Sequence, residues 1–326
     1  ATKKPTLVQL HSTPGVGNGI GALYQAKRGH SPLVVVGGDA GIRYQAMDAQ
    51  MAGDLVAMCE PVTKWSAMVQ DPASLLRMVR RAVKIAATPP MGPVYLCLPQ
   101  DILDAPCVEE VRPTSLPSTR VTPDPALIQQ AAAWLAAAQS PLILMGDGIA
   151  YSGAEAELVR VAELLGAEVW GVDSGELNMA YDHPLYQGQT GHMFGFGSLP
   201  ITRRGDAVLV CGTAVLPEVF PELGSVFAPD AKVVHIDLNL YEIAKNHPVS
   251  LGMLGDPKLS LAALAVALEA ALSPAQRQAA TGRREALAGA GAAKRAAELE
   301  ADRKVWDAVP MRSGRFMEEL AARLSE

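Results

Sequence analysis

The sequence predicts an α/β protein built from two consecutive parallel-sheet domains and a C-terminal helical connector. Short apolar runs alternate with segments of helical periodicity, a pattern typical of buried parallel strands joined by helices. The alternation stops once, in a stretch rich in Pro, Ser and Thr, and then resumes. A chain of 326 residues is also too long for one ordinary domain and suits two.

The first series occupies residues 1–103, where apolar runs such as PLVVVGG and GPVYLCLP are bounded by turn residues. Such runs predict strands buried on both faces of a parallel sheet. Residues 104–125 lack periodicity, and we interpret them as a linker. The predicted strands of this series are 6–10, 32–38 and 92–99, and the predicted helices are 19–29 and 74–88.

The second series occupies residues 126–272 and ends in a helix rich in Ala and Leu. Within residues 273–326, the part up to 305 has little apolar stripe, which predicts a solvated helical connector. Residues 309–326 begin an amphipathic helix whose unburied apolar face indicates that something is missing after it. The predicted strands are 141–146, 167–172, 206–212 and 231–238, and the predicted helices are 126–139, 153–166 and 259–272.

Composition limits the classes of function. The formal net charge is −6 and basic residues occur in no run longer than a pair, which argues against a nucleic-acid partner. No apolar run approaches the ~18 residues of a membrane span, so we expect no membrane partner. The four cysteines form no CxxC pair, which favours reduced, buried thiols. The chain enters its first strand without a signal peptide, so we expect a cytoplasmic protein.

The first candidate site follows the first predicted strand, in TLVQLHSTPGVGNGIGAL. Gly17–Ala22 fits the spacing of a dinucleotide fingerprint, with Asp39 ending the next strand, which would make the chain a Rossmann dehydrogenase. The match is weak because His-Ser-Thr-Pro separates the strand from the glycines. His11 stands where open α/β sheets bind ligands, and imidazole can transfer a proton near neutral pH. The alternative is a turn histidine bonded to nearby backbone.

The second candidate is Gly146-Asp147-Gly148, between a predicted strand and a predicted helix. We expect Ser152 and Glu155 to form a capping box and Gly166 to end the helix. A strand, a Gly loop and a helix N-terminus can bind an anion through backbone N–H groups. The alternative is a tight turn in which Asp147 bonds its own backbone.

The third candidate is a set of small or polar residues at other strand ends, which could surround a nucleotide while an Asp bonds its ribose. The alternative is a sheet edge without any ligand. The histidines lack partners at ligand spacing, so the sequence predicts no metal site within this chain. The residues of this set are Ser174, Thr190, Gly191, His192 and Asp237.

Several motifs, in the same order, resemble the thiamine-diphosphate (ThDP) enzymes of the benzoylformate decarboxylase, acetohydroxyacid synthase and pyruvate oxidase type. LHSTPGVGNGIGAL, EPVTKWS and PPMGPVYLCLPQDI resemble the later part of their pyrimidine-binding domain. SPLILMGDGIAYSGAEAELV and AKVVHIDLNLYEIAKNHP resemble their Rossmann-like central domain, and VPMRSGRFMEEL resembles the first helix of their diphosphate-binding domain. The resemblance implies a fragment without the activating Glu, upstream, and without the magnesium-binding motif, downstream.

The resemblance implies part of a ThDP- and Mg²⁺-dependent 2-oxo-acid decarboxylase or carboligase, inactive as the isolated chain. His11 matches the proton-transferring histidine of benzoylformate decarboxylase, and Gly15 and Asn18 match positions around the aminopyrimidine ring. That decarboxylase's second histidine has no counterpart near Val219 and Phe220, which puts benzoylformate as substrate in doubt.

The family's central domain holds FAD, ADP or nothing. The resemblance therefore also allows a flavin-containing acetolactate synthase-like enzyme, or a nucleotide-binding module without catalysis. The loops of the second and third candidates match the family's nucleotide contacts in position. An Asn follows the family's magnesium-binding Gly-Asp-Gly at a fixed spacing, and Asn178 lies too far from Gly148 to fit, which disfavours a metal role there. A homo-oligomer, dimer or tetramer, is the expected assembly.

Overall fold

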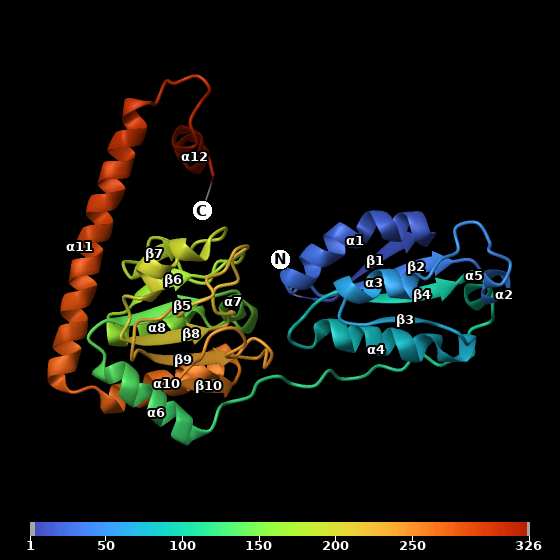
Figure 1. Cartoon of the computed structure of the whole chain (residues 1–326), viewed down its shortest axis with the longest axis horizontal. Coiled ribbons are helices and arrows are strands. Elements are labelled where there is room, and N and C mark those ends of the chain that lie inside the picture. The colour runs from blue at the N-terminus through green and yellow to red at the C-terminus, as the bar shows by residue number, and fades with distance from the viewer. Residues whose placement is uncertain (1–3, 325–326) are drawn as a thin grey trace. The chain divides into compact units, whose positions relative to one another are not determined.

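The computed structural model describes residues 4–324 and divides the chain into two compact units. The first unit ends at Val121 and the second begins at Thr122. Each unit contains its own parallel sheet with helices packed on it, which confirms the predicted α/β class (Figure 1).

The sheet of the first unit has four strands in the order β1-β2-β4-β3, and every pair is parallel. The three predicted strands are present. The fourth, β3, escaped prediction because its three residues, Ser-Ala-Met, carry no recognisable period. The strands are β1 (Thr6–His11), β2 (Leu33–Asp39), β3 (Ser66–Met68) and β4 (Val94–Pro99).

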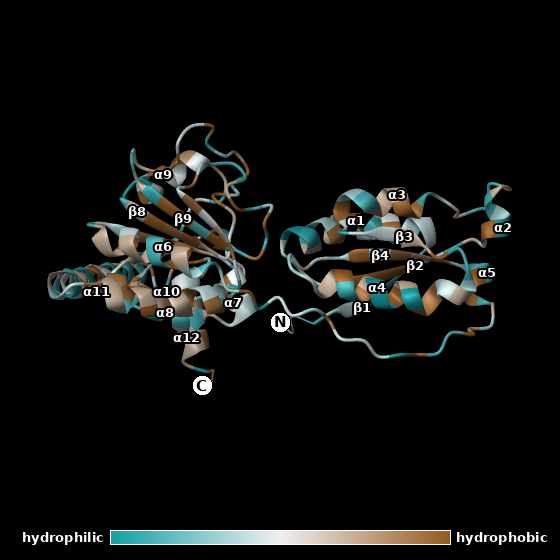
Figure 2. Ribbon diagram, turned by 90° about the horizontal axis from the view of Figure 1, so that it is seen from below, coloured by the Kyte–Doolittle hydropathy of each residue, from teal (hydrophilic) through white to brown (hydrophobic). Residues whose placement is uncertain are grey.

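Helices cover both faces of this sheet, and apolar strand residues lie between them (Figure 2). On one face α1 and α3 pack over Val35 and Tyr95, and on the other α4 packs over Val34 and Val94. The helices are α1 (Ser12–Arg28), α2 (Ile42–Gln45), α3 (Leu55–Cys59), α4 (Leu75–Ala87) and α5 (Gln100–Leu103), with 3₁₀ turns η1 (Glu60–Val62) and η2 (Pro72–Ser74).

Helix α1 starts directly after β1, several residues earlier than predicted. The glycines of the dinucleotide-like motif therefore lie inside a helix and form no phosphate-binding loop. Gly19 instead lets α1 approach the strand, since a Cβ there would lie 2.8 Å from Leu10 Cδ1. This geometry contradicts the fingerprint that the dehydrogenase alternative requires.

No helix or strand lies between Leu103 and Pro125 among the described residues. Within this stretch the Glu109 carboxylate accepts hydrogen bonds from the Leu76 and Arg77 N–H groups at 2.6 and 3.4 Å. A carboxylate at a helix N-terminus satisfies free donors and the helix dipole. The start of the predicted linker is thus attached to α4 of the first unit.

The sheet of the second unit has six parallel strands in the order β10-β9-β8-β5-β6-β7. The four predicted strands are present, whereas β7 and β10 were missed. Both have four residues and contain glycine, so they lack a continuous apolar run. The strands are β5 (Pro141–Met145), β6 (Glu168–Gly171), β7 (Tyr186–Gln189), β8 (Ala207–Cys211), β9 (Lys232–Asp237) and β10 (Leu251–Leu254).

Three helices, α6, α8 and α10, bury one face of this sheet against Ile143 and Leu209. The other face is covered by loop residues such as Val215 and Phe227. The helices are α6 (Pro125–Ala137), α7 (Gly148–Ser152), α8 (Glu155–Leu165), α9 (Leu199–Thr202) and α10 (Pro257–Ala271), with the 3₁₀ turn η3 (Gly195–Gly197).

The predicted capping box is wrong. Ser152 closes the short helix α7, and its hydroxyl donates to the Gly148 carbonyl at 3.0 Å. Gly153, in the left-handed region at φ 66°, separates α7 from α8, which Glu155 begins without a side-chain cap. Gly166 ends α8 at φ 58°, as predicted.

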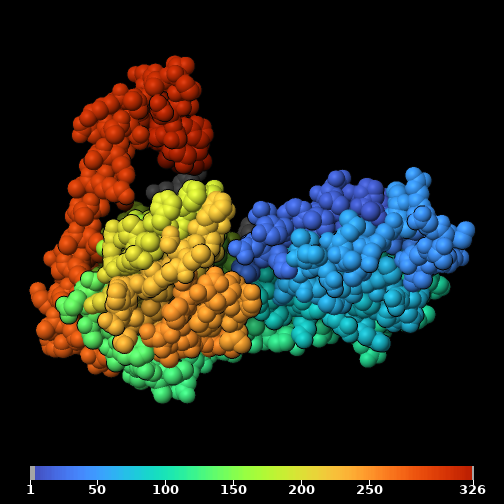
Figure 3. Space-filling view, in the orientation of Figure 1, coloured from blue at the N-terminus to red at the C-terminus, as the bar shows by residue number. Residues whose placement is uncertain are grey.

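The predicted connector is one long helix, α11 (Pro274–Lys304), whose start carries a capping box of Ser273 and Gln276. Only its first turns pack on the rest of the second unit: the Arg283 guanidinium donates to the Leu165 carbonyl at the end of α8, at 2.5 and 3.2 Å. Most residues after them are exposed, and α11 extends clear of the sheet and its covering helices (Figure 3).

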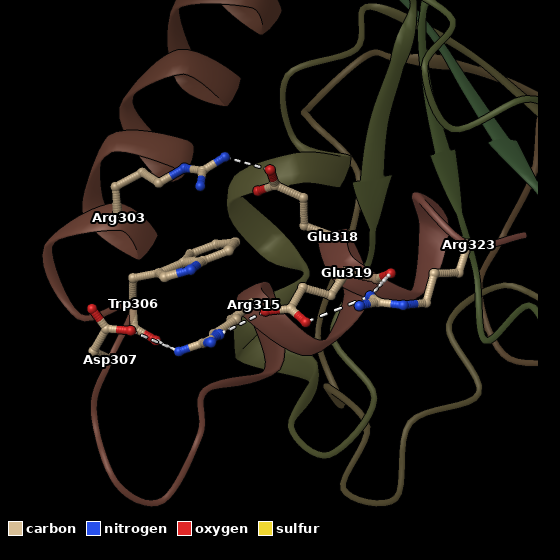
Figure 4. Close-up of polar contacts among 7 residues, drawn as sticks. All are labelled: Arg303, Trp306, Asp307, Arg315, Glu318, Glu319 and Arg323. Atoms are coloured by element: carbon tan, nitrogen blue, oxygen red, sulfur yellow. Dashed lines mark hydrogen bonds and ion pairs between the residues drawn. The ribbon is translucent and has the colours of Figure 1, made fainter.

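Helix α12 (Ser313–Ala321) follows and is tied to the end of α11 by a polar network (Figure 4). Arg315 contacts Asp307 and Glu319, each at 2.8 Å, and Arg303 pairs with Glu318. In the described part of the chain no helix is long and apolar enough to span a membrane.

Candidate functional site

His11 is the last residue of β1, at the carboxyl edge of the first sheet. Its side chain is exposed, and residues 4–324 offer it no hydrogen-bond partner. Asp39 ends the neighbouring strand but is buried and engaged: it accepts from the Ala40 N–H at 2.8 Å and from Gln45 Nε2 at 3.3 Å. At this edge the imidazole is therefore available for proton transfer and the carboxylate is structural.

The backbone beside His11 is held in an uncommon conformation. Ser12 is buried at φ 47°, and Met51, in the loop after α2, has φ 69°. The Thr13 hydroxyl donates to the Met51 carbonyl at 2.7 Å, which brings this loop against the start of α1. Left-handed backbone in residues other than glycine costs about 1–3 kcal/mol and concentrates at functional sites.

Gly15 and Asn18 lie in the first two turns of α1, close in sequence to His11. Gly15 is half-buried against Leu10, and Asn18 is exposed. A Cβ on Gly15 would lie 3.8 Å from His11 Cβ, so these two residues lie side by side where β1 meets α1.

Gly146 and Gly148 lie at the carboxyl end of β5, against the loop that follows β8. Their N–H groups donate to the Cys211 and Gly212 carbonyls at 3.2 and 2.9 Å. A Cβ on Gly146 would lie 2.4 Å from Thr213 Cβ, and one on Gly148 would lie 2.6 Å from Gly212 Cα. The two glycines therefore allow close packing of two loops, and their N–H groups are not free for an anion.

Asp147 is bonded to the loop after β6 and not to its own turn. Its carboxylate accepts from the Gly175 and Glu176 N–H groups at 3.0 Å and from Asn178 Nδ2 at 3.0 Å. The side-chain oxygen Oδ1 of Asn178 accepts in turn from the Ala150 N–H at 3.1 Å. The Asp–Asn pair thus joins two strand-end loops through hydrogen bonds.

The loop after β7 holds a buried hydroxyl and an exposed imidazole. Thr190 is buried, and its Oγ1 has no partner among the described residues. The Gly191 N–H donates to Ser198 Oγ at 3.0 Å. His192 is exposed, and its Nδ1 lies 2.9 Å from the Asp173 carboxylate. The other ring nitrogen, Nε2, therefore does not contact this carboxylate.

At the end of β9, Asp237 is half-buried and accepts from the Asn239 N–H at 2.6 Å. Burial raises the pKa of this carboxyl to about 6. Two residues earlier His235 is fully buried: its Nε2 donates to the Thr213 carbonyl at 2.9 Å while Nδ1 accepts from the Ala244 N–H. Burial lowers the pKa of His235, which keeps this doubly bonded imidazole neutral.

The second and third candidates therefore gather at one edge of the second sheet, at the ends of β5, β6, β7 and β9. Ser174 joins them through its hydroxyl, which lies 3.5 Å from the Met145 carbonyl. His11, Gly15 and Asn18 belong to the other unit. Sequence reasoning missed Ser198 and Glu218, whose side chains pair at 2.7 Å, because no motif or spacing relates them. Within residues 4–324 no three His, Cys, Asp or Glu side chains are grouped to hold a metal.

Two parallel sheets, each with polar residues at its carboxyl edge, define a two-domain α/β protein of the ligand-binding kind. The family model "thiamine pyrophosphate enzyme, N-terminal TPP binding domain" matches residues 1–58, and "thiamine pyrophosphate enzyme, central domain" matches residues 128–264. The chain belongs to the thiamine pyrophosphate (thiamine diphosphate) enzyme family, which confirms the resemblance seen in the sequence.

Proteins of similar sequence and solved structures of similar fold support this family assignment. The "Probable acetolactate synthase large subunit" of Methanocaldococcus jannaschii is 31% identical over 264 residues, which are 79% of this chain and 44% of the relative. A structure from Mycobacterium smegmatis, described as thiamin diphosphate-dependent, has 30% identity and a TM-score of 0.75, covering 84% of this chain and 52% of that one. Benzoylformate decarboxylase from Polynucleobacter necessarius has 26% identity and a TM-score of 0.73, covering 83% and 50%. The chain thus spans about half the length of these relatives.

Proposed function

We propose that this chain is part of a ThDP- and Mg²⁺-dependent enzyme that decarboxylates a 2-oxo acid or joins it to a second carbonyl compound. One observation carries the proposal: His11 stands exposed at the carboxyl end of β1, inside the segment that matches the N-terminal TPP binding domain. The relatives named acetolactate synthase and benzoylformate decarboxylase support this substrate class.

When bound, thiamine diphosphate supplies the nucleophilic carbon and the electron sink for loss of carbon dioxide. His11 holds or moves a proton at the oxygen of the substrate's reacting carbonyl, because its imidazole is exposed and has no hydrogen-bond partner among the described residues. Gly15 and Asn18 would contact the aminopyrimidine side of the cofactor, and the Thr13–Met51 hydrogen bond fixes the start of α1, directly after His11.

The test replaces His11 in the complete protein that carries this sequence. We expect His11→Ala to lower kcat/KM for the preferred 2-oxo acid by about 100- to 10,000-fold, the range of a general acid or base. Lys84→Ala is the control, since Lys84 is exposed on α4, which packs on the face of the first sheet opposite α1. A His11→Ala enzyme with unchanged kcat/KM would exclude this role.

A second candidate function is nucleotide binding by the second unit, with FAD or ADP along the edge of its sheet. The specific observation is the buried Thr190 hydroxyl, which has no hydrogen-bond partner within residues 4–324 and lies two residues before the exposed His192. The phosphate groups of FAD or ADP cannot bind the Gly146 and Gly148 N–H groups, because these already donate to backbone carbonyls. Ser174, His192 and Asp237 therefore have to supply the polar contacts to the nucleotide. Flavin absorbance in the purified protein would favour an acetolactate synthase-like enzyme. If flavin is absent, calorimetry with ADP tests whether the pocket binds another nucleotide. Thr190→Val should weaken the binding of either ligand.

The complete protein is proposed to be a cytoplasmic homo-oligomer, a dimer or a tetramer. Exposed apolar side chains on α12, including Phe316 and Met317, fit a covering surface that comes either from a further domain of the complete protein or from a second subunit. Light scattering on the purified protein measures its mass directly, and a monomer would contradict the proposal.

A further inference from the structure

A buried pair of side chains connects the loop after β7 with the loop after β8. Ser198 is fully buried and Glu218 is only 8% exposed. The Ser198 hydroxyl donates to Glu218 Oε1 at 2.7 Å and accepts from the Gly191 N–H at 3.0 Å. A continuous chain of hydrogen bonds therefore runs from the backbone of one loop to a carboxylate of the other.

A carboxylate at such a depth is unfavourable for stability alone. Taking a charge out of water is costly, and the Ser198 hydroxyl together with the nearby imidazole of His247 offsets only part of the loss. The second oxygen, Oε2, is buried without a partner in the described part of the chain. Since an apolar side chain would serve packing better, Glu218 points to a role beyond packing.

Backbone hydrogen bonds show what the pair holds together. The Val219 and Phe220 N–H groups donate to the His192 and Met193 carbonyls at 3.1 and 2.9 Å, and the Gly195 N–H donates to the Phe220 carbonyl at 2.9 Å. The two loops thus run side by side as a short parallel bridge. This bridge orders the backbone on both sides of His192.

We propose that Ser198 and Glu218 are positioning residues that fix the Thr190–His192 segment before any ligand binds. The proposal rests on the second candidate function, nucleotide binding by this unit. With the pair intact, Thr190 and His192 stand ready in one conformation. Without it the Gly191 N–H is left without its acceptor, the loop becomes mobile, and a ligand has to order the loop as it binds.

The first experiment measures hydrogen exchange in the whole chain for Ser198→Ala, Glu218→Ala and Glu218→Gln. We expect exchange in peptides covering residues 190–196 and 218–221 to accelerate at least about tenfold for the two Ala variants. Glu218→Gln keeps an acceptor for Ser198 and should stay within about threefold of the wild type. Thr202→Val is the matched control, because its fully buried hydroxyl bonds the Val226 carbonyl, outside both peptides.

A general loss of stability would accelerate exchange in the Thr202→Val control as well. Equal acceleration in Ser198→Ala and Thr202→Val, or none in either Ala variant of the pair, would overturn the positioning role. Calorimetry with FAD and ADP then tests the consequence: at least about tenfold weaker binding for Ser198→Ala and unchanged binding for Thr202→Val. If the wild type binds neither nucleotide, the second candidate function fails, while the exchange data still decide whether the pair orders the loop.

Discussion

At the scale of single residues, Asp147 shows how a motif associated with metal binding can serve a structural purpose. Its carboxylate accepts from two backbone N–H groups and from Asn178 Nδ2, so its oxygens are already occupied. We expect Asp147→Ala to lower the free energy of unfolding of the second unit by about 2–3 kcal/mol, because three donors lose their acceptor. Urea denaturation followed by circular dichroism measures this change.

Asp182→Ala is the control for Asp147, because Asp182 is exposed and should change stability by less than about 0.5 kcal/mol. If Asp147 bound a metal ion, added metal would stabilise the protein. Millimolar Mg²⁺ would then raise the wild-type Tm and leave Asp147→Ala unaffected, which would refute the structural interpretation.

Asp237 predicts a pH dependence of stability. Burial raises its pKa from 3.8 to about 6, so the folded state retains a proton that the unfolded state has released. The stability of the wild type should therefore fall as the pH rises from about 4 to 6 and stay lower above that range. Relative to Asp237→Asn, the loss above pH 6 should reach about 2–3 kcal/mol.

The comparison of wild type with Asp237→Asn by urea denaturation between pH 4 and 8 isolates this one group, because other titrations cancel in the difference. Asp230→Asn serves as the control, since Asp230 is exposed and precedes the same strand. A difference between wild type and Asp237→Asn that does not change with pH would contradict the expected titration.

At the scale of elements, Gly166 joins two helices. It ends α8 in the left-handed region, and a Cβ there would lie 2.3 Å from the Ala280 carbonyl of α11. We expect Gly166→Ala to destabilise the second unit by at least about 1–3 kcal/mol, through backbone strain and the clash. Gly289→Ala in α11 meets no atom within 4 Å and should instead stabilise the helix by about 0.5–1 kcal/mol. Thermal unfolding of both variants tests the contrast, and equal effects would contradict it.

Helix α12 depends on exposed charges for its attachment to α11. The Trp306 ring lies 4.1 Å from the Arg303 guanidinium carbon and 5.7 Å from that of Arg315, and Arg315 also donates to the Trp306 carbonyl (Figure 4). We expect Arg315→Gln, or 1 M salt on the wild type, to accelerate hydrogen exchange in α12 while α8 is unaffected. Arg295→Gln, on the exposed part of α11, is the control. Exchange in α12 that is independent of both Arg315 and salt would rule out this attachment.

Elements were predictable from sequence where one physical signal dominated. Strands such as β5 and β8 are continuous apolar runs because both faces are buried, and α10 shows its length through unbroken apolar spacing. By contrast β3, β7 and β10 depend on pairing with neighbours, which a single sequence does not display. The helix expected at 153–166 starts at Glu155 instead. The prediction was wrong there because Ser152, a good capping residue by type, bonds back to the Gly148 carbonyl.

At the scale of the whole molecule, the candidate site was predictable only as far as topology determines it. Parallel strands bring their carboxyl ends to one edge, so Asp147, after β5, and Asp237, at the end of β9, could be assigned to the same edge from the predicted strands alone. Hydrogen-bond partners could not be predicted, because they depend on how loops of different length fold back over the edge of the sheet. Asp147 with Asn178 and Ser198 with Glu218 are pairs of this kind.

The division of the chain into two units predicts two separate unfolding transitions. Each unit has its own sheet and its own buried cores, and residues 104–124 contribute no helix or strand to either. The second unit should be the more stable, because its main core extends across six strands and three helices, whereas the four-stranded sheet of the first unit leaves Leu7 on its edge strand largely exposed. We expect urea to unfold the first unit at a lower concentration, as detected by hydrogen exchange of peptides from β1–β4 and β5–β10. Fragments 1–121 and 122–326 should reproduce the two midpoints, and a single transition shared by all peptides would show that the units fold as one.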